Sequence, residues 1–355
     1  AAAYEPRAAS EPRVASEPET GRVADEAVPP ARGAPGTSVA GGSAAAGAGG
    51  AVAAGADDTA EEARLGAVPC PLNAMPGGAE IGSLVHAVFE RTDFTAGDLD
   101  GDLRAHIREQ LAWRHLDVGD PDAVVAGLRA AIDTPLGPLA GEVALRDVAG
   151  ADRLDELDFE LPLVGGDTPT ATLTIAAIAD VLRTHLPAGD VLAGYPDRLA
   201  DPALARDLRG YLAGSIDLLL RVCAADGTPR FTVVDYKTNW LGVDGEDLTA
   251  RASRRAQAPL TCWHYRPAAL ADAMVRGHYP LQALLYAVAA HRYLRWRLPG
   301  YRPERHLAGI AYLFVRGMTG ADVPRVDGRP CGVFAWQPPA GLVEALSDLF
   351  DAGSP

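Results

Sequence analysis

The chain has 355 residues, of which 48% are hydrophobic, and it carries a formal net charge of −15 at pH 7. A chain of this length can form one or two domains, and it holds no apolar run of about 18 residues that could span a membrane. Its four cysteines are scattered without a CxxC pair, which argues against a zinc site or a disulfide framework and makes a cytoplasmic location the expectation.

The N-terminal segment differs from the rest of the chain in composition. Residues 1–70 consist largely of alanine, glycine, proline, glutamate and serine, as in the stretch GGSAAAGAGGAVAAGA. Such a segment buries too little apolar surface to offset the entropy lost on ordering. We therefore expect a disordered tail or linker over residues 1–70 and one domain over residues 71–355.

Positive charge is concentrated in one segment of this acidic chain. Residues 251–306 contain ten arginines against two acidic residues, together with several aromatic side chains. This combination suits a phosphate backbone with stacked bases, although the net charge of the whole chain argues against a nucleic-acid partner. A solvated, arginine-rich helix surface is an equally good interpretation on charge alone.

The first half of the expected domain is mainly helical. Residues 81–91 place apolar side chains at helical spacing and predict a helix that carries His86 near its first turns. Residues 96–133 predict further helices. Residues 154–163 alternate apolar and acidic side chains, which is typical of a half-buried strand, and residues 174–186 predict an amphipathic helix.

A β-hairpin is the best-defined unit of the chain. Residues 210–222 and 231–240 are apolar runs with β character, and they flank a segment with an Asp-Gly turn. Asp217 and Asp235 would then lie on neighbouring antiparallel strands.

The C-terminal third mixes helices with one more strand. Helices are expected at residues 251–258, 268–275, 279–298 and 339–350, and a strand is expected at residues 307–318. Strands mixed with helices and a hairpin predict an α/β fold, in which helices flank a small mixed sheet.

The second strand of the hairpin carries Lys237, the only lysine of the chain. Because side chains alternate along a strand, Asp235 and Lys237 share one face, and Asp217 can add its carboxylate to the same patch. Two carboxylates beside an ammonium group suit Mg²⁺ and the hydrolysis of a phosphodiester. A guanidinium group is broader and does not lose its proton, which explains why arginine does not replace this lysine.

Simpler interpretations remain open on these residues alone. A strand lysine next to an aspartate is usually an exposed and weak ion pair, and an isolated His86 on an apolar helix is more often a core residue than a ligand. A kinase-like nucleotide site is not expected, because the chain has no glycine-rich phosphate loop, and the single lysine does not lie in a G-K-[ST] motif.

Several motifs in order resemble one known family. From about residue 78 to the C-terminus, the succession is similar to the nuclease domain of the RecB family, within the PD-(D/E)xK nuclease superfamily and its restriction-endonuclease-like fold. The matching stretches are GSLVHAVFE, DELDFELPL, GYLAGSIDLLLRV, VVDYKTNWLG, YPLQALLYAVAAHRYL and GIAYLFVRGM.

The resemblance implies a set of metal-binding and catalytic residues. His86, Asp217 and Asp235 match the family's metal ligands, the carbonyl of Tyr236 matches a backbone ligand, and Lys237 matches the catalytic lysine. One Mg²⁺ is expected at this site, and a second ion is left open.

Further site residues follow from weaker matches. Glu156 resembles the family's acidic residue in E-x-x-F, but neighbouring acids leave this register open. Gln282 and Tyr286 match a Q-x-x-x-Y motif that lines the site and approaches DNA, and the arginine-rich segment adds Arg292 and Arg295 as expected DNA contacts.

The resemblance also implies a biological setting. It points to a Mg²⁺-dependent deoxyribonuclease that processes double-strand breaks on linear DNA together with a helicase, RecC- and RecD-like subunits and RecA. Neither an ATP site nor an iron–sulfur cluster is expected in these residues. The alternative function is a nuclease-fold module that binds DNA or a repair complex without cleaving.

Overall fold

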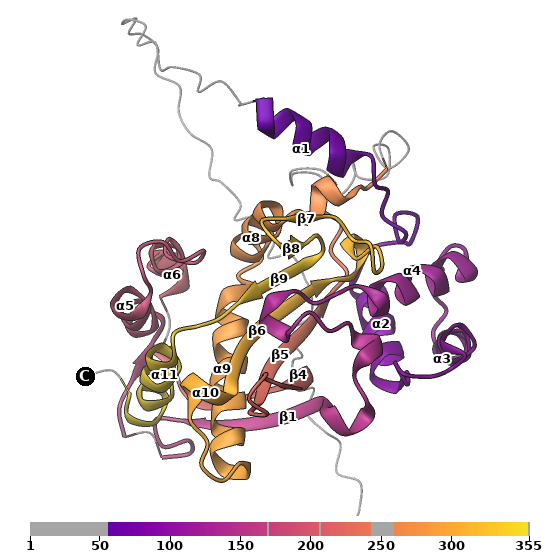
Figure 1. Ribbon diagram of the computed structural model, residues 1–355. Coiled ribbons are helices and arrows are strands. Elements are labelled where there is room, and N and C mark those ends of the chain that lie inside the picture. The colour runs from indigo at the N-terminus through magenta and orange to yellow at the C-terminus, as the bar shows by residue number, and fades with distance from the viewer. Residues whose placement is uncertain (1–55, 169, 206, 243–258, 354–355) are drawn as a thin grey trace, which may run out of the picture.

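A five-stranded sheet forms the centre of the molecule (Figure 1). This computed structural model describes residues 56–168, 170–205, 207–242 and 259–353. The strand order is β1-β4-β5-β6-β9. The bounds of these strands are Arg153–Leu163 for β1, Gly210–Cys223 for β4, Pro229–Lys237 for β5, Leu307–Phe314 for β6 and Val333–Trp336 for β9.

The sheet is mixed in its strand directions. Strand β4 pairs antiparallel with β1 and with β5, so that β4 and β5 form the predicted hairpin. Strand β5 pairs parallel with β6, and β6 pairs antiparallel with β9. Together with the flanking helices, this sheet confirms the predicted α/β fold of the restriction-endonuclease-like type.

Three helices cover one face of the sheet. They are α2 (Ala79–Arg91), α3 (Leu99–Trp113) and α4 (Pro121–Asp133), and their apolar side chains pack with those of β4 and β5 in one buried core. The side chains of Asp98 and Asp120 accept hydrogen bonds from the first backbone N–H groups of α3 and α4 and so fix where these helices begin.

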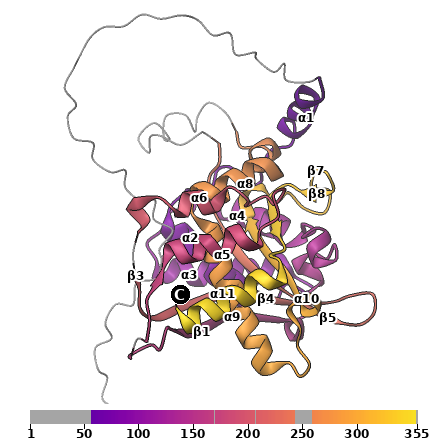
Figure 2. The same ribbon diagram turned by 90° about the vertical axis from the view of Figure 1, so that its left-hand side faces the viewer.

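A second set of helices builds a core on the opposite face, as Figure 2 shows from the side of α5, α6 and α11. Among the residues described, no helix is both long enough and apolar enough to cross a membrane. The bounds of this set are Ile175–His185 for α5, Tyr195–Leu199 for α6, Pro267–Arg276 for α8, Tyr279–Arg297 for α9 and Ala340–Ala352 for α11.

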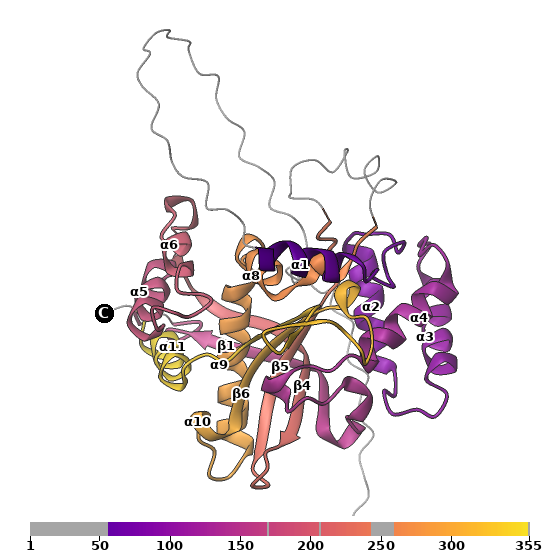
Figure 3. The same cartoon turned by 45° about the horizontal axis from the view of Figure 1, so that its top comes forward.

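Part of the segment expected to be a tail is helical. Residues Ala56–Gly66 form helix α1, which lies near α8 in Figure 3. Leu65 of this helix is fully buried with Cys262, Val323 and Cys331. One buried leucine thus attaches this largely polar helix to the rest of the chain, ahead of the boundary predicted at residue 70. Residues 1–55 lie outside the described residues.

Most predicted elements are present, with differences at their ends. The strand predicted at 307–318 stops at Phe314, because Val315–Gly317 form a 3-10 turn that holds the buried Arg316. The helix predicted at 251–258 lies outside the described residues. Short elements that the sequence analysis missed are β2 (Leu173–Thr174), β3 (Asp207–Leu208), α10 (Pro303–His306), β7 (Arg325–Val326), β8 (Arg329–Pro330) and β9.

Candidate active site

The strands of the hairpin separate where its two aspartates lie. Backbone pairing of β4 with β5 ends at Leu218 and Val234. Two residues after Val234, the N–H group of Tyr236 donates a hydrogen bond of 2.8 Å to Oδ2 of Asp217. A side-chain carboxylate thus takes the place of a backbone acceptor where the pairing of the two strands ends.

Helix α2 brings His86 to this end of the pairing. Its Nε2 atom lies 2.8 Å from the carbonyl oxygen of Tyr236, and its Nδ1 atom lies 3.4 Å from Oδ2 of Asp217. Phe89 of the same helix packs edge-on against the Tyr236 ring, with 4.9 Å between centroids, and holds α2 against β5. The predicted neighbourhood of His86, Asp217 and the Tyr236 carbonyl is therefore present in the structure.

Glu156 lies on the other side of Asp217. The pairs Asp155–Leu218 and Leu157–Ile216 place Glu156 opposite Asp217 in the register of β1 and β4. Its backbone has φ of 47°, a left-handed conformation that costs roughly 1–2 kcal/mol for a residue other than glycine. The strained residue lies in the middle of β1, next to the other residues of the candidate site. Backbone strain of this kind is concentrated at active sites.

His86, Glu156 and Asp217 together form a potential cation site. One ligand atom from each lies within 4.8 Å of the others, and the described part of the chain contains no other such group of three. An imidazole with two carboxylates fits a divalent cation, and hard oxygen donors favour Mg²⁺. Glu156, predicted with an open register, lies in this group, and Asp235, predicted as a further ligand, lies next to Lys237 as its strand position predicts.

Burial and neighbouring charges shift the pKa values of several groups in the site. Burial lowers the pKa of His86, but the hydrogen bond and charge of Asp217, with the charge of Asp235, outweigh burial and raise the pKa to about 9. Burial also raises the pKa of Glu156, and that of Asp235 despite the nearby Lys237. Glu156 and Asp217 lie close together, and a divalent cation would supply positive charge to both.

Lys237 is buried next to Asp235. Its Nζ atom lies 2.8 Å from Oδ2 of Asp235, and the two side chains are only 7% and 2% exposed. The interpretation of Lys237 as an exposed strand lysine is therefore wrong. An ion pair buried to this degree carries a large desolvation cost, which the surroundings of the pair must offset.

The Q-x-x-x-Y motif forms a hydrogen-bonded network within the protein. The hydroxyl of Tyr312 donates to Oε1 of Gln282 at 3.0 Å, and Nε2 of Gln282 donates to the hydroxyl of Tyr286 at 3.0 Å. The Tyr286 ring in turn packs edge-on against Phe159 of β1, with 5.9 Å between centroids. These contacts connect α9 with β6 and β1, and the Gln282 amide is engaged on both sides.

The two predicted arginine contacts lie elsewhere. Arg292 donates to the side chain and the carbonyl of Ser347, at 3.0 and 2.7 Å, and pairs with Asp351 at 2.8 Å. It therefore anchors α9 to α11, and the expected DNA contact is not supported for Arg292. Arg295 is exposed, but 13 residues separate it from Gln282, which is about 20 Å along a helix. Arg295 is therefore too distant to contact a phosphate group that also contacts Gln282.

Sequence analysis missed three residues around Lys237. Tyr279 and Tyr312 place their rings beside its ammonium group. The fully buried Arg316 donates to the carbonyl of Thr238, next to Lys237 in sequence, and to carbonyls of residues 72, 75 and 76 ahead of α2. The position of Tyr279, one helical turn before Gln282, was an available signal.

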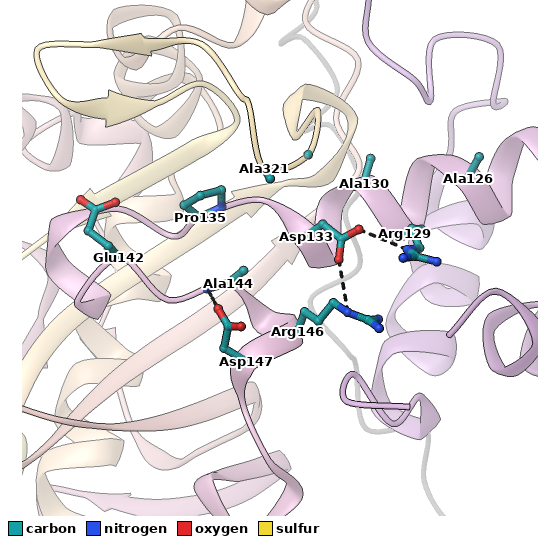
Figure 4. A pocket seen from close by; sticks show the side chains of 11 residues that line it. Ala126, Arg129, Ala130, Asp133, Pro135, Glu142, Ala144, Arg146, Asp147 and Ala321 are labelled. Carbon is teal, nitrogen blue, oxygen red and sulfur yellow. Dashed lines mark hydrogen bonds and ion pairs between the residues drawn. The ribbon is translucent and has the colours of Figure 1, made fainter. Parts of the chain in front are cut away.

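A pocket of about 470 Å³ lies apart from these residues (Figure 4). Its lining includes Arg129, Asp133 and Arg146, and none of the predicted site residues. Asp133 already pairs with Arg129 at 3.1 Å and with Arg146 at 3.8 Å. The charges of this pocket are thus largely satisfied within the protein, and the pocket is not the candidate active site.

Comparison with known proteins agrees with this geometry. The RecBCD enzyme subunit RecB of Mycolicibacterium smegmatis is 48% identical over 290 residues, which cover 81% of this chain and 25% of that protein. The RecB subunit of Mycobacterium tuberculosis is 47% identical over 289 residues, 80% of this chain and 24% of that protein. The RecB subunit of Escherichia coli is 30% identical over 275 residues, 78% of this chain and 19% of that protein.

The chain thus spans a quarter or less of the length of these relatives. A family model described as the PD-(D/E)XK nuclease superfamily matches residues 62–331, a range that includes every predicted site residue. The resemblance to RecB-type nucleases is confirmed by both comparisons. With the D-x-K strand, the opposed carboxylates and the mixed sheet in place, the chain belongs to the PD-(D/E)XK nuclease superfamily.

Proposed function

We propose that this chain is a Mg²⁺-dependent nuclease module that hydrolyses phosphodiester bonds of linear DNA. The arrangement that carries this proposal is the buried Asp235–Lys237 pair beside the cluster of His86, Glu156 and Asp217. The cluster of His86, Glu156 and Asp217 suits the binding of a cation, whereas the ammonium group of Lys237 suits contact with a water molecule or a phosphate oxygen.

Each side chain has a role in this proposal. His86, Glu156 and Asp217 would hold the Mg²⁺, with Asp235 and the Tyr236 carbonyl next to them. When bound, Mg²⁺ would supply positive charge to the phosphate and lower the pKa of a bound water.

Lys237 would orient the attacking water. Its ammonium group would also offset the negative charge that develops on phosphorus oxygens. Burial of Lys237 and Asp235 excludes bulk water, which strengthens both effects.

The relatives suggest partners for the module. They are named as RecB subunits of a RecBCD enzyme, and the chain matches a quarter or less of them. We extend this to the present chain as a proposal: RecC- and RecD-like subunits or another helicase would deliver the DNA strand during double-strand break repair. Hand-over of single strands to RecA belongs to the same proposal.

A cleavage assay tests the proposed function. The purified chain should degrade linear, end-labelled single-stranded DNA with Mg²⁺ and stop when EDTA is added. The variants Asp217→Asn and Lys237→Ala should lose at least about 100-fold in rate, and their melting temperatures show whether a loss reflects unfolding. Binding of DNA by the wild type without any cleavage would point to the non-cleaving scaffold instead.

A further inference from the structure

Two tyrosine rings lie on one side of the ammonium group of Lys237. Its Nζ atom lies 4.6 Å from the ring centroid of Tyr279 and 5.5 Å from that of Tyr312. The two rings stack on each other, with 5.9 Å between centroids and 27° between planes. Both distances lie within the range of cation–π attraction, which strengthens when the cation is removed from water.

The rings come from different elements and are held in place separately. Tyr312 of β6 lies beside Asp235 in the parallel register, and its hydroxyl donates to Gln282. Tyr279 is the first residue of α9, and its hydroxyl accepts a hydrogen bond of 3.0 Å from the Asn239 side chain. The Asn239 carbonyl is itself fixed by a bond of 2.8 Å from the Tyr265 hydroxyl.

Contact with the two rings partly offsets the free-energy cost of removing the ion pair from water. Lys237 is 7% exposed, so aromatic faces take the place of much of its water shell. Asp235 attracts the ammonium from one side, and the rings limit its position on another. The same pocket suits a compact ammonium group better than a broad, planar guanidinium group.

We propose that Tyr279 is a positioning residue, whose ring face holds the Lys237 ammonium at the site in the orientation that the reaction requires. The expected effect of Tyr279 on cleavage rests on the proposed nuclease function, whereas the position of the lysine can be measured without any activity. The Tyr279 hydroxyl contributes through Asn239 to the orientation of the ring, and the ring itself acts on the lysine.

Because Lys237 is the only lysine, the placement can be observed directly. In protein labelled selectively with ¹³C-lysine, the full chain should give one set of lysine side-chain signals. Ring currents of the two tyrosines should shift the ε-methylene protons of the wild type upfield of an exposed lysine. Tyr279→Leu should move this signal most of the way toward the exposed value, and Tyr279→Phe should leave it close to the wild type.

Activity provides the second readout. Tyr279→Leu should lower kcat about tenfold with little change in KM, because the lost cation–π contact affects the position of the lysine and leaves DNA binding intact. Tyr279→Phe should retain kcat within about twofold, since it keeps the ring. In a Lys237→Ala background, the Leu substitution should have no further effect, as expected for two residues that act through one group.

The control is Tyr293→Leu on the same helix, about 21 Å along its axis from Tyr279. It should change neither the lysine signal nor kcat, and melting temperatures of all variants show whether a loss reflects unfolding. An unshifted lysine signal in the wild type, or the same signal in Tyr279→Leu, would overturn the inference. A shifted signal that responds to Tyr279→Leu in a protein that cleaves no DNA would support the placement and reject the nuclease function.

Discussion

Lys237 combines burial, an ion pair and two aromatic contacts in one side chain. Its ammonium group is 2.8 Å from Asp235 and within 6 Å of two tyrosine centroids. The site therefore fits one shape of cation, and the identity of the residue matters more than its charge.

Substitution of Lys237 by arginine tests this point. We expect Lys237→Arg to lower the single-turnover rate on linear single-stranded DNA by at least about 100-fold, because the guanidinium group cannot take the place of the ammonium between Asp235 and the rings. The melting temperature of the variant shows whether a lost rate reflects unfolding, because the guanidinium group is broader than the ammonium that it replaces. Full activity in this variant would contradict the explanation of why the chain keeps one lysine.

Glu156 is the site residue whose role the structure changes most. It faces Asp217 and belongs to the cation group, whereas Asp158, two residues later, is exposed. We expect Glu156→Gln to raise the Mg²⁺ concentration needed for half-maximal cleavage about tenfold or more, with partial recovery at high Mg²⁺. Asp158→Asn is the matched control and should titrate like the wild type; equal effects of the two variants would remove Glu156 from the site.

Among the elements, the long helix α9 contributes residues to the candidate site at one end and binds α11 near the other end. Its first turns carry Tyr279, Gln282 and Tyr286 next to the sheet, while Arg292 binds α11 near the other end. We expect Arg292→Ala to lower the free energy of unfolding by about 2 kcal/mol, because two hydrogen bonds and an ion pair are lost. Urea denaturation measures this loss, and DNA affinity should not change; weaker DNA binding without destabilisation would restore the predicted contact.

The same helix contains a histidine that makes folding sensitive to acid. His291 is 3% exposed and lies 3.2 Å from the Tyr301 hydroxyl. Burial, followed by the charges of Arg295 and Arg292, lowers the pKa of His291 to about 4, while Asp348 acts in the opposite direction. The unfolded chain therefore binds a proton at higher pH than the folded chain does.

The sign of the pH effect follows from this difference. The contribution of His291 to stability is complete above about pH 6.5 and is lost as the pH falls from about 6.5 to about 4, by up to about 3 kcal/mol. Below that range this group has no further effect. The free energy of unfolding of His291→Asn, measured across the same range, should fall less steeply with acid than that of the wild type; parallel curves would show that His291 does not titrate this way.

The elements also show how far sequence could predict this protein. The hairpin and the D-x-K face follow from period-two patterns that a strand imposes on its residues, and these were predicted from the residues themselves. The contact of His86 with Tyr236 joins residues 150 positions apart. Local patterns do not contain that information, so it came from the family resemblance.

The missed features have physical reasons as well. Strand β9 has four residues, too few for a recognisable period. Glu156 was predicted as a site residue with its register open, because its left-handed backbone in mid-strand is a conformation that no propensity favours. A count of charges also does not show that Ser347 and Asp351 of α11 bind Arg292, so the internal contacts of this arginine could not be predicted.

At the scale of the molecule, the site joins the two layers that cover the sheet. His86 comes from the helical layer of α2 to α4, and Tyr279 comes from α9 in the opposite layer. Glu156, Asp217 and Asp235 come from three strands of the sheet between them. Formation of the site therefore requires both cores, and a cation bound there would stabilise the folded chain as a whole.

The most direct test of the cation site is a crystal structure of the chain soaked with Mn²⁺, read by anomalous diffraction. We predict an anomalous peak within ligand distance, about 2–2.5 Å, of His86, Glu156 and Asp217. Lys237 Nζ should lie nearby without coordinating the ion. The peak should disappear in Asp217→Asn crystals. A peak at another place, or no peak in well-ordered wild-type crystals at saturating Mn²⁺, would contradict the proposal that these three residues share one ion.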